Sequence, residues 1–260
     1  MIRERDADML ALGIDRVWWM PPNGALHGVA IDRLMWWNLV ALTALFLLAH
    51  IFLFGAMARG RKAASDGARL SLKWELVPLA GITLIYAWMA ISAQRLWGTI
   101  RYQGAAPQAL QVEVTGEQFQ WYFRYPGADA VFGLTRPELI NAPAGNPLGL
   151  DRADPHSADD VVSSVLVLPA GREVDLGIRS IDVIHGFFIP GMRLKQNAVP
   201  GMEMHVHFTP AVVGDYPILC SQVCGSGHAR MQAHLRVVPE SEFQAWLASH
   251  APRHMEGTGR

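Results

Sequence analysis

Two uninterrupted apolar runs dominate the first hundred residues. Leu34–Ala58 and Leu76–Gln94 contain no Asp, Glu, Lys or Arg. Each run is long enough to cross a hydrocarbon core of about 30 Å as a helix. Buried helices of a soluble domain rarely run so far without a charge. We therefore predict membrane spans at about 34–58 and 76–97, which form an anchor of residues 34–103.

Basic residues outnumber acidic ones between the two spans. The charged residues there are Arg59, Arg61, Lys62, Arg69 and Lys73 against Asp66 and Glu75. Short loops rich in Lys and Arg stay in the cytoplasm. Residues 1–33 and everything after the second span are then expected on the outer, periplasmic side. Met1–Asp8 is charged and unlike a signal peptide, so the hairpin itself is expected to direct the chain to the membrane.

Beyond Gly104 the pattern changes to short runs in which apolar and polar residues alternate, as is typical of β-strands. The runs are Leu110–Val114, Gln118–Tyr125, Val161–Leu168, Glu173–Ile178, Glu203–Thr209, Asp215–Leu219 and Ala233–Val238. Their spacing predicts an antiparallel sandwich or barrel over residues 108–239.

Two segments lie outside this β pattern. Residues 129–160 are rich in Pro, Gly, Asn and Asp, and we interpret them as a long surface excursion between two strands. Loops of this length are usually functional or disordered, and a solvated acidic insertion and a docking element are both open. Residues 240–260 are expected to form a short amphipathic helix through Trp246 and a tail.

Composition adds two constraints. Apolar residues make up 51% of the chain and charged residues 17%, which fits a membrane anchor. The formal net charge of −1 gives no indication of nucleic-acid binding. The two cysteines, Cys220 and Cys224, cannot form a disulfide framework, so a local use is expected.

The segment 220–231 holds the residues with the clearest chemistry. Cys220, Cys224, His228 and Met231 supply two thiols, an imidazole and a thioether within twelve positions. Soft sulfur with imidazole selects copper, zinc or iron–sulfur centres, and a weak thioether ligand favours copper. A disulfide would leave His228 and Met231 unexplained, and a blue-copper site needs only one Cys. A structural zinc ion is normally bound by four Cys or His ligands.

A second imidazole has to come from elsewhere in the outer domain. His185 is the best candidate, because it follows a strand-like stretch and lies in a turn with an apolar flank. The other candidates are His156, His205, His207 and His234, for which ordinary surface or structural roles are favoured. Two thiolates, two imidazoles, one Met and a backbone carbonyl would suit two copper ions bridged by the sulfurs.

The segment 220–231 resembles the dinuclear copper (CuA) loop of cytochrome c oxidase subunit II. Asp182–His185 is similar to the stretch around the first histidine ligand of that family, and Ile189–Gly201 to the segment that follows it. Trp74 and Pro78 also match. The resemblance covers residues from about 34 to 239.

This resemblance implies a two-helix transmembrane hairpin followed by an all-β cupredoxin-like Greek-key sandwich. It implies two copper ions, one bound by His185 and the other by His228, with both cysteines bridging them. Met231 would be the weak ligand of one copper, and the backbone carbonyl of Gln222 would bind the other.

The resemblance also implies an electron-entry subunit in a bacterial inner membrane, with its copper domain on the periplasmic side. Electrons would come from cytochrome c and pass to haem in subunit I, where oxygen is reduced to water; subunit III is a further expected partner. Alternatives are the same role in a copper-containing nitric oxide reductase, a structural quinol oxidase subunit, and a copper-delivery protein.

Three departures from the family pattern concern charge. Gln222 stands where many members have a Glu associated with magnesium at the subunit I interface, and a neutral amide is a weaker ligand for that cation. We therefore do not expect the magnesium site. Asn197 replaces a common Asp, and Ser71 replaces a Glu linked to proton uptake, for which Glu75 is a nearby substitute.

A fourth departure concerns electron entry. Phe119 stands where many members have the Trp at which electrons are thought to enter. Phe119, Trp121 and Tyr122 are the candidates for this role, and Trp121 is equally suited to a place in the core.

Overall fold

The computed structural model describes residues 20–59 and 72–251. These fall into two compact units. One consists of the segment up to Val29 together with the chain from Gly104 onward, and the other of residues 30–103. Ser71, at which we noted a departure from the family, lies outside the described residues.

Two long helices make up most of the first part of the chain. Helix α2 spans Leu26–Arg59 and helix α3 spans Leu72–Trp97, so the expected spans at 34–58 and 76–97 lie inside them. A π-helical turn, Gly98–Tyr102, follows α3. Both helices are long and apolar enough to cross a membrane, and their most apolar windows have no buried residue.

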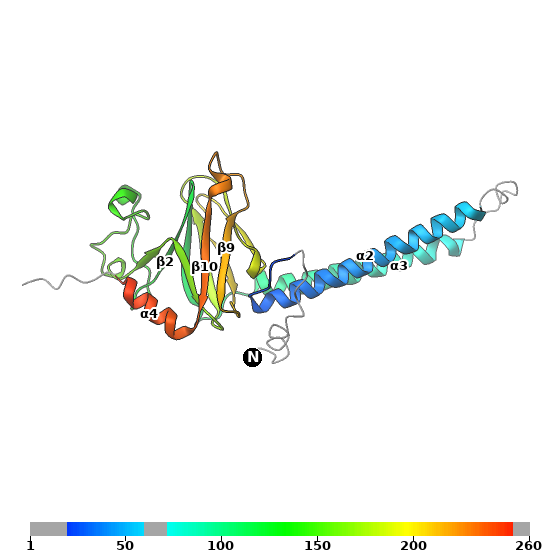
Figure 1. Cartoon of the computed structure of the whole chain (residues 1–260), viewed down its shortest axis with the longest axis horizontal. Coiled ribbons are helices and arrows are strands. Elements are labelled where there is room, and N and C mark those ends of the chain that lie inside the picture. The colour runs from blue at the N-terminus through cyan, green and yellow to red at the C-terminus, as the bar shows by residue number, and fades with distance from the viewer. Residues whose placement is uncertain (1–19, 60–71, 252–260) are drawn as a thin grey trace, which may run out of the picture. The chain divides into compact units, whose positions relative to one another are not determined.

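The rest of the chain folds into two five-stranded sheets that pack as a sandwich (Figure 1). The first sheet has the order β3-β2-β1-β5-β8, and its strands are Val161–Ser163, Gln120–Tyr125, Leu110–Glu117, Val174–Ser180 and Met204–Phe208. The second has the order β4-β10-β9-β6-β7, and its strands are Val165–Pro169, Gln232–Val238, Gly214–Cys220, His185–Ile189 and Leu194–Ala198.

The topology differs from the sequence prediction in two respects. Most neighbouring strands are antiparallel, but β1 runs parallel to β5 and β4 parallel to β10. The predicted single strand Val161–Leu168 is wrong, because it divides into β3 and β4, which belong to different sheets. Ser163 bridges this crossing: its hydroxyl accepts from the Val165 amide at 3.0 Å and donates to the Val165 carbonyl at 2.8 Å.

Aromatic side chains fill the space between the sheets. Trp121, Phe123 and Tyr125 alternate along β2 and are fully buried, and the Phe187 ring lies edge-on to both Trp121 and Phe123. Each such side chain removes roughly 150–250 Å² from water, so these rings dominate the core. Helix α4, Glu240–His250, closes one side of the sandwich, where its Trp246 contacts Tyr125.

The residues just before and at the start of α2 belong to the β-sandwich. The Gly24 amide donates to the Gly191 carbonyl at 2.7 Å, and the Ala211 amide donates to the Gly24 carbonyl at 2.7 Å. Ala25 is fully buried and forms a bridge with Pro210. This segment therefore adds a short strand-like edge to the β-sandwich.

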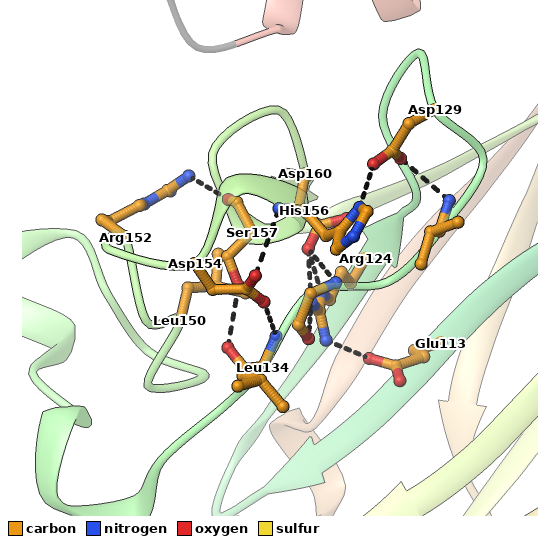
Figure 2. A network of polar contacts seen from close by, with 12 residues as sticks. Glu113, Arg124, Asp129, Leu134, Leu150, Arg152, Asp154, His156, Ser157 and Asp160 are labelled. Carbon is orange, nitrogen blue, oxygen red and sulfur yellow. Dashed lines mark hydrogen bonds and ion pairs between the residues drawn. The ribbon is translucent and has the colours of Figure 1, made fainter.

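The excursion at 129–160 is an ordered surface element tied to the sheet by one buried arginine. Arg124, on the outer face of β2, has a side chain only 2% exposed. Its guanidinium donates to the Asp160 carboxylate, to Glu113 Oε2 at 3.0 Å and to the Gly133 carbonyl at 2.5 Å. Figure 2 shows Arg124 between the sheet and the excursion. Within the excursion itself, the Asp154 carboxylate accepts from the Leu134 amide at 2.6 Å.

Removal of this arginine is expected to destabilise the sandwich. Arg124→Leu leaves the buried carboxylate of Asp160 without its cation, a change that typically costs about 3–5 kcal/mol. Urea unfolding of the full chain in detergent, followed by near-ultraviolet circular dichroism, measures the loss.

Arg136 provides the matched control. It pairs with Asp151 at 2.7 Å, but its side chain is 56% exposed, so Arg136→Leu should change the free energy of unfolding by no more than about 1 kcal/mol. Equal losses in the two variants would contradict the role given to Arg124.

Candidate metal centre

Two neighbouring strands of the second sheet bring the predicted ligands together. Strand β6 begins at His185 and β9 ends at Cys220, and the two strands pair antiparallel with Phe187 opposite Cys220. The start of one strand therefore lies at the same end of the sheet as the finish of the other. The ligand loop, residues 221–231, joins β9 to β10 at this end and carries Cys224, His228 and Met231.

Sulfur and nitrogen atoms of five side chains converge here. The ligand atoms of His185, Cys220 and Cys224 all lie within 4.8 Å of one another. Cys224 Sγ is 3.8 Å from Cys220 Sγ. The same sulfur is 3.7 Å from His228 Nδ1 and 3.7 Å from Met231 Sδ. The sulfur of Cys224 is therefore the central donor atom of the cluster.

The backbone carbonyl of Gln222 also points into this group. It lies 3.2 Å from Cys220 Sγ, while the Gln222 side chain is exposed. All six residues predicted as ligands, His185, Cys220, Gln222, Cys224, His228 and Met231, are therefore in one place.

The donor set fits a soft transition metal. His185 is fully buried, and its Nδ1 has no hydrogen-bond partner among the residues that the structure describes, whereas Nε2 lies 2.8 Å from Asp182 Oδ1. A proton on Nε2 would leave the Nδ1 lone pair free for a metal. Metal-bound histidines commonly donate the N–H of their other ring nitrogen to a carboxylate in this way. Two thiols, a thioether and two imidazoles are ligands that copper accepts.

The cysteines are present as free thiols. Their sulfurs are too far apart for a disulfide, which needs about 2.05 Å. Burial raises the pKa of Cys224 to about 11, helped by the hydrogen bond and like charge of Cys220. Because a thiolate is the metal-binding form, two adjacent thiolates in this site require a cation to balance them.

The other candidate histidines lie away from the cluster. Three of them face carboxylates: His156 Nδ1 is 2.6 Å from Asp129, His205 Nδ1 is 3.1 Å from Asp175 and His207 Nδ1 is 3.0 Å from Glu173. His234 is exposed on β10.

Comparison with known proteins identifies the family. Residues 110–238 match the family model described as the periplasmic domain of cytochrome c oxidase subunit II. The alternative cytochrome c oxidase subunit 2 of Bradyrhizobium diazoefficiens is 35% identical over 237 residues, which cover 88% of this chain and 83% of that protein. The chain belongs to the cytochrome c oxidase subunit II family.

Two further proteins are similar to this chain. Cytochrome c oxidase subunit 2 of Cereibacter sphaeroides is 30% identical over 192 residues, which cover 68% of this chain and 59% of that protein. A solved structure of the periplasmic domain from Bradyrhizobium japonicum is 26% identical, covers 55% of this chain and 95% of its own, and has a TM-score of 0.40. As a subunit II, the protein is part of a haem–copper oxidase and assembles with subunit I.

The three aromatic residues considered for electron entry occupy different environments in this subunit II. Trp121 is fully buried, with its ring edge-on to His185 at a centroid distance of 5.8 Å. Phe119, between β1 and β2, is 37% exposed. It lies against the ligand loop, because a methyl group added at Gly227 would overlap its ring. Tyr122 is half-buried on the outer face of β2.

Gly186 holds the ligand loop close to His185. The Ser221 amide donates to the Gly186 carbonyl at 2.8 Å. A methyl group at Gly186 would overlap the Ser221 hydroxyl and come within 2.9 Å of the Gln222 backbone nitrogen. Asn197, one of the departures from the family pattern, pairs with Gly186 from strand β7 and is exposed.

Gly186→Ala is therefore expected to push the ligand loop away from His185. Overpacking of this kind costs about 1–3 kcal/mol, which corresponds to a loss of copper affinity of about tenfold to a hundredfold. Competition with a chromophoric copper chelator measures this affinity on the full chain in detergent.

Gly177→Ala on β5 is the matched control, because the added methyl group would meet mainly the flexible carboxylate end of Glu203. Copper affinity should then stay within a factor of two or so of the unaltered protein. An unchanged affinity in Gly186→Ala would show that the ligand loop does not depend on this close approach.

Proposed function

We propose that this subunit receives electrons from cytochrome c at a two-copper centre and passes them to haem in subunit I for the reduction of oxygen to water. The observation that carries the proposal is the convergence of the six donors around Cys224. Copper bound there would supply a one-electron redox centre. Subunit III is a further proposed partner.

The proposed ligand roles follow the donor positions. Cys220 and Cys224 would be shared by both metals, and His185 and His228 would each bind one through Nδ1. Met231, which is 1% exposed, and the Gln222 carbonyl would complete the two sets of ligands. Burial of His185, Cys224 and Met231 would keep water away from bound copper.

The proposed location is a bacterial inner membrane, with α2 and α3 as the anchor of residues 34–103 and the copper domain, residues 108–239, in the periplasm. The proposal includes an N-terminal periplasmic segment at 1–33 and a C-terminal helix and tail at 240–260. Support comes from the length and apolar character of the helices and from the match of residues 110–238 to a periplasmic domain.

Copper spectroscopy tests the centre directly. The full chain in detergent, loaded with copper, is expected to bind two coppers per chain and to give a seven-line, mixed-valence electron paramagnetic resonance spectrum. Cys220→Ser and Cys224→Ser should abolish that spectrum, because either change removes a bridging sulfur. A four-line spectrum with one copper would falsify the two-copper assignment.

Ser226→Ala is the matched control for the cysteine variants, since Ser226 lies in the same loop, is exposed and has a side chain of similar size. Its spectrum should equal that of the unaltered chain. Copurification of the detergent-solubilised complex, followed by assays of oxygen and nitric oxide consumption, separates the oxidase from the nitric oxide reductase alternative.

The proposed entry face for electrons is the exposed surface next to the ligands. It is largely apolar: Phe119, Ile181, Val183, Ile184 and Val223 are all more than a third exposed. Within 118–119, 181–184 and 221–231 the only Asp, Glu, Lys or Arg residues are Asp182 and Arg230, whose charges cancel. A donor would therefore dock here mainly through apolar contact, and Phe119 would supply an aromatic ring within this face.

Docking of this kind should depend weakly on salt. Electrostatic steering falls steeply with ionic strength, whereas apolar contact does not. Oxidation of reduced cytochrome c by the intact complex is expected to change less than about threefold between 20 and 200 mM salt. Val223→Asp should slow it at least about tenfold by placing a charge in the contact.

Val131→Asp is the matched control, because Val131 is 46% exposed but lies in the excursion. It should leave the rate unchanged. A steep loss of rate with salt, or equal effects of the two substitutions, would refute apolar docking at this face.

A further inference from the structure

One carboxylate joins the two segments that carry the metal ligands. Asp182 Oδ1 accepts from the Val183 amide at 2.6 Å and from the Ser180 hydroxyl at 3.2 Å, and it lies 2.8 Å from His185 Nε2. Asp182 Oδ2 accepts from the Gln118 amide at 2.7 Å. The group therefore touches the loop before β6, the ligand His185 and the turn between β1 and β2.

Gln118 continues the connection to the other ligand segment. Its side-chain Nε2 donates to the Cys224 carbonyl at 2.5 Å. Gln118 is far from both partners in sequence, with 64 positions to Asp182 and 106 to Cys224. An unbroken series of hydrogen bonds thus runs from His185 through Asp182 and Gln118 to Cys224.

The same turn carries the exposed aromatic ring. Phe119 follows Gln118 directly, and methyl groups added at Gly225 or Gly227 would both meet the Phe119 ring. The turn is thereby held against the ligand loop by the Gln118 hydrogen bond on one side and by the ring on the other. Any displacement of this turn would move both Phe119 and the backbone of Cys224.

We propose that Asp182 and Gln118 are positioning residues that act as one hydrogen-bonded support, which fixes His185 and Cys224 relative to each other and to Phe119. This inference rests on the proposed copper function. Neither residue offers an atom to the metal. Asp182 keeps the proton of His185 on Nε2, so that Nδ1 faces the thiols, and Gln118 holds the carbonyl of the central cysteine.

A role limited to loop folding is the competing explanation, because Asp182 also caps the turn at Ser180 and Val183. The two explanations differ in what they predict for the metal. A cap affects only the stability of the metal-free fold. A positioning group affects metal affinity, the reduction potential and the spectrum. Residues that hydrogen-bond to metal-bound histidines typically contribute 10- to 100-fold to metal affinity.

Asp182→Asn provides the first test. The substitution removes the negative charge beside His185. It also places the side-chain NH2 group of the asparagine, a hydrogen-bond donor, next to another donor, either the Gln118 amide or His185 Nε2. Copper affinity of the full chain in detergent should fall about 10- to 100-fold. The reduction potential should rise, because the lost negative charge favoured the more positively charged oxidised centre, and the seven-line spectrum should change its hyperfine pattern.

Asp215→Asn is the matched control. It removes the same charge from the same domain. The Asp215 side chain is 74% exposed and forms an ion pair with Arg236. Affinity, potential and spectrum should equal those of the unaltered protein. Thermal unfolding of the metal-free variants shows whether each still folds.

Gln118→Met tests the second member without removing charge. Methionine has a similar length but cannot donate to the Cys224 carbonyl. The expected result is a loss of affinity of the same order with an altered spectrum, whereas Gln120→Met, an exposed change two residues along, should have neither effect. If Asp182→Asn fails to fold, this pair still decides the role of the support.

The double variant tests whether the two residues act together. Groups in one hydrogen-bonded network are not additive, so the combined loss should be clearly smaller than the product of the two single losses. If the loss of affinity in the double variant equals the product of the two single losses, the two residues do not act as one support. If affinity, potential and spectrum are unchanged in both single variants, the positioning role is wrong.

The unaltered chain separates this inference from the proposed function. If the unaltered chain gives no seven-line spectrum, the two-copper function itself fails. If it gives that spectrum and the single variants match it, the function stands and the support is wrong.

Discussion

The antiparallel pairing of β6 with β9 is the constraint on which the metal centre depends. It sets the first residue of one strand, His185, beside the last residue of the other, Cys220. Register in a sheet is fixed by the faces that must be buried, since a slip of one residue turns every side chain to the opposite face. Phe187 lies opposite Cys220 and is fully buried, so the aromatic core of the sandwich and the position of the ligands are set by the same pairing.

Much of this arrangement is visible in the sequence where the signal is local. Long apolar runs specify helices α2 and α3 without reference to any other part of the chain. Five of the six proposed ligands lie within twelve positions, so their spacing alone indicates a soft-metal loop. His185 is 35 positions before Cys220 and could be chosen only by its flanks, because strand pairing is what brings it near.

The features that the sequence did not reveal depend on distant contacts. Strand β6 lacks a clear alternation of apolar and polar residues, since both of its faces are largely covered. Strand β7 has apolar residues only at its two ends, Leu194 and Ala198. The crossing at Ser163 between sheets interrupts an apolar run that would otherwise be a single strand. The ordered conformation of the excursion depends on the contact between Arg124 and Asp160, which are 36 positions apart in the sequence. An arginine among aromatic residues on β2 was the only sequence signal for that contact, because a charge there has to be paired.

The excursion also has a topological property that follows from the sheet. Its two ends are neighbours, since Tyr125 at the end of β2 pairs directly with Val161 at the start of β3. Residues 126–160 therefore occupy a place that a tight hairpin turn could fill. Such an insertion can change in length over evolution without any change in strand order or in the metal centre. Arg124 limits this freedom: a chain that loses the excursion loses Asp160, and the buried Arg124 then keeps only Glu113 as a carboxylate partner.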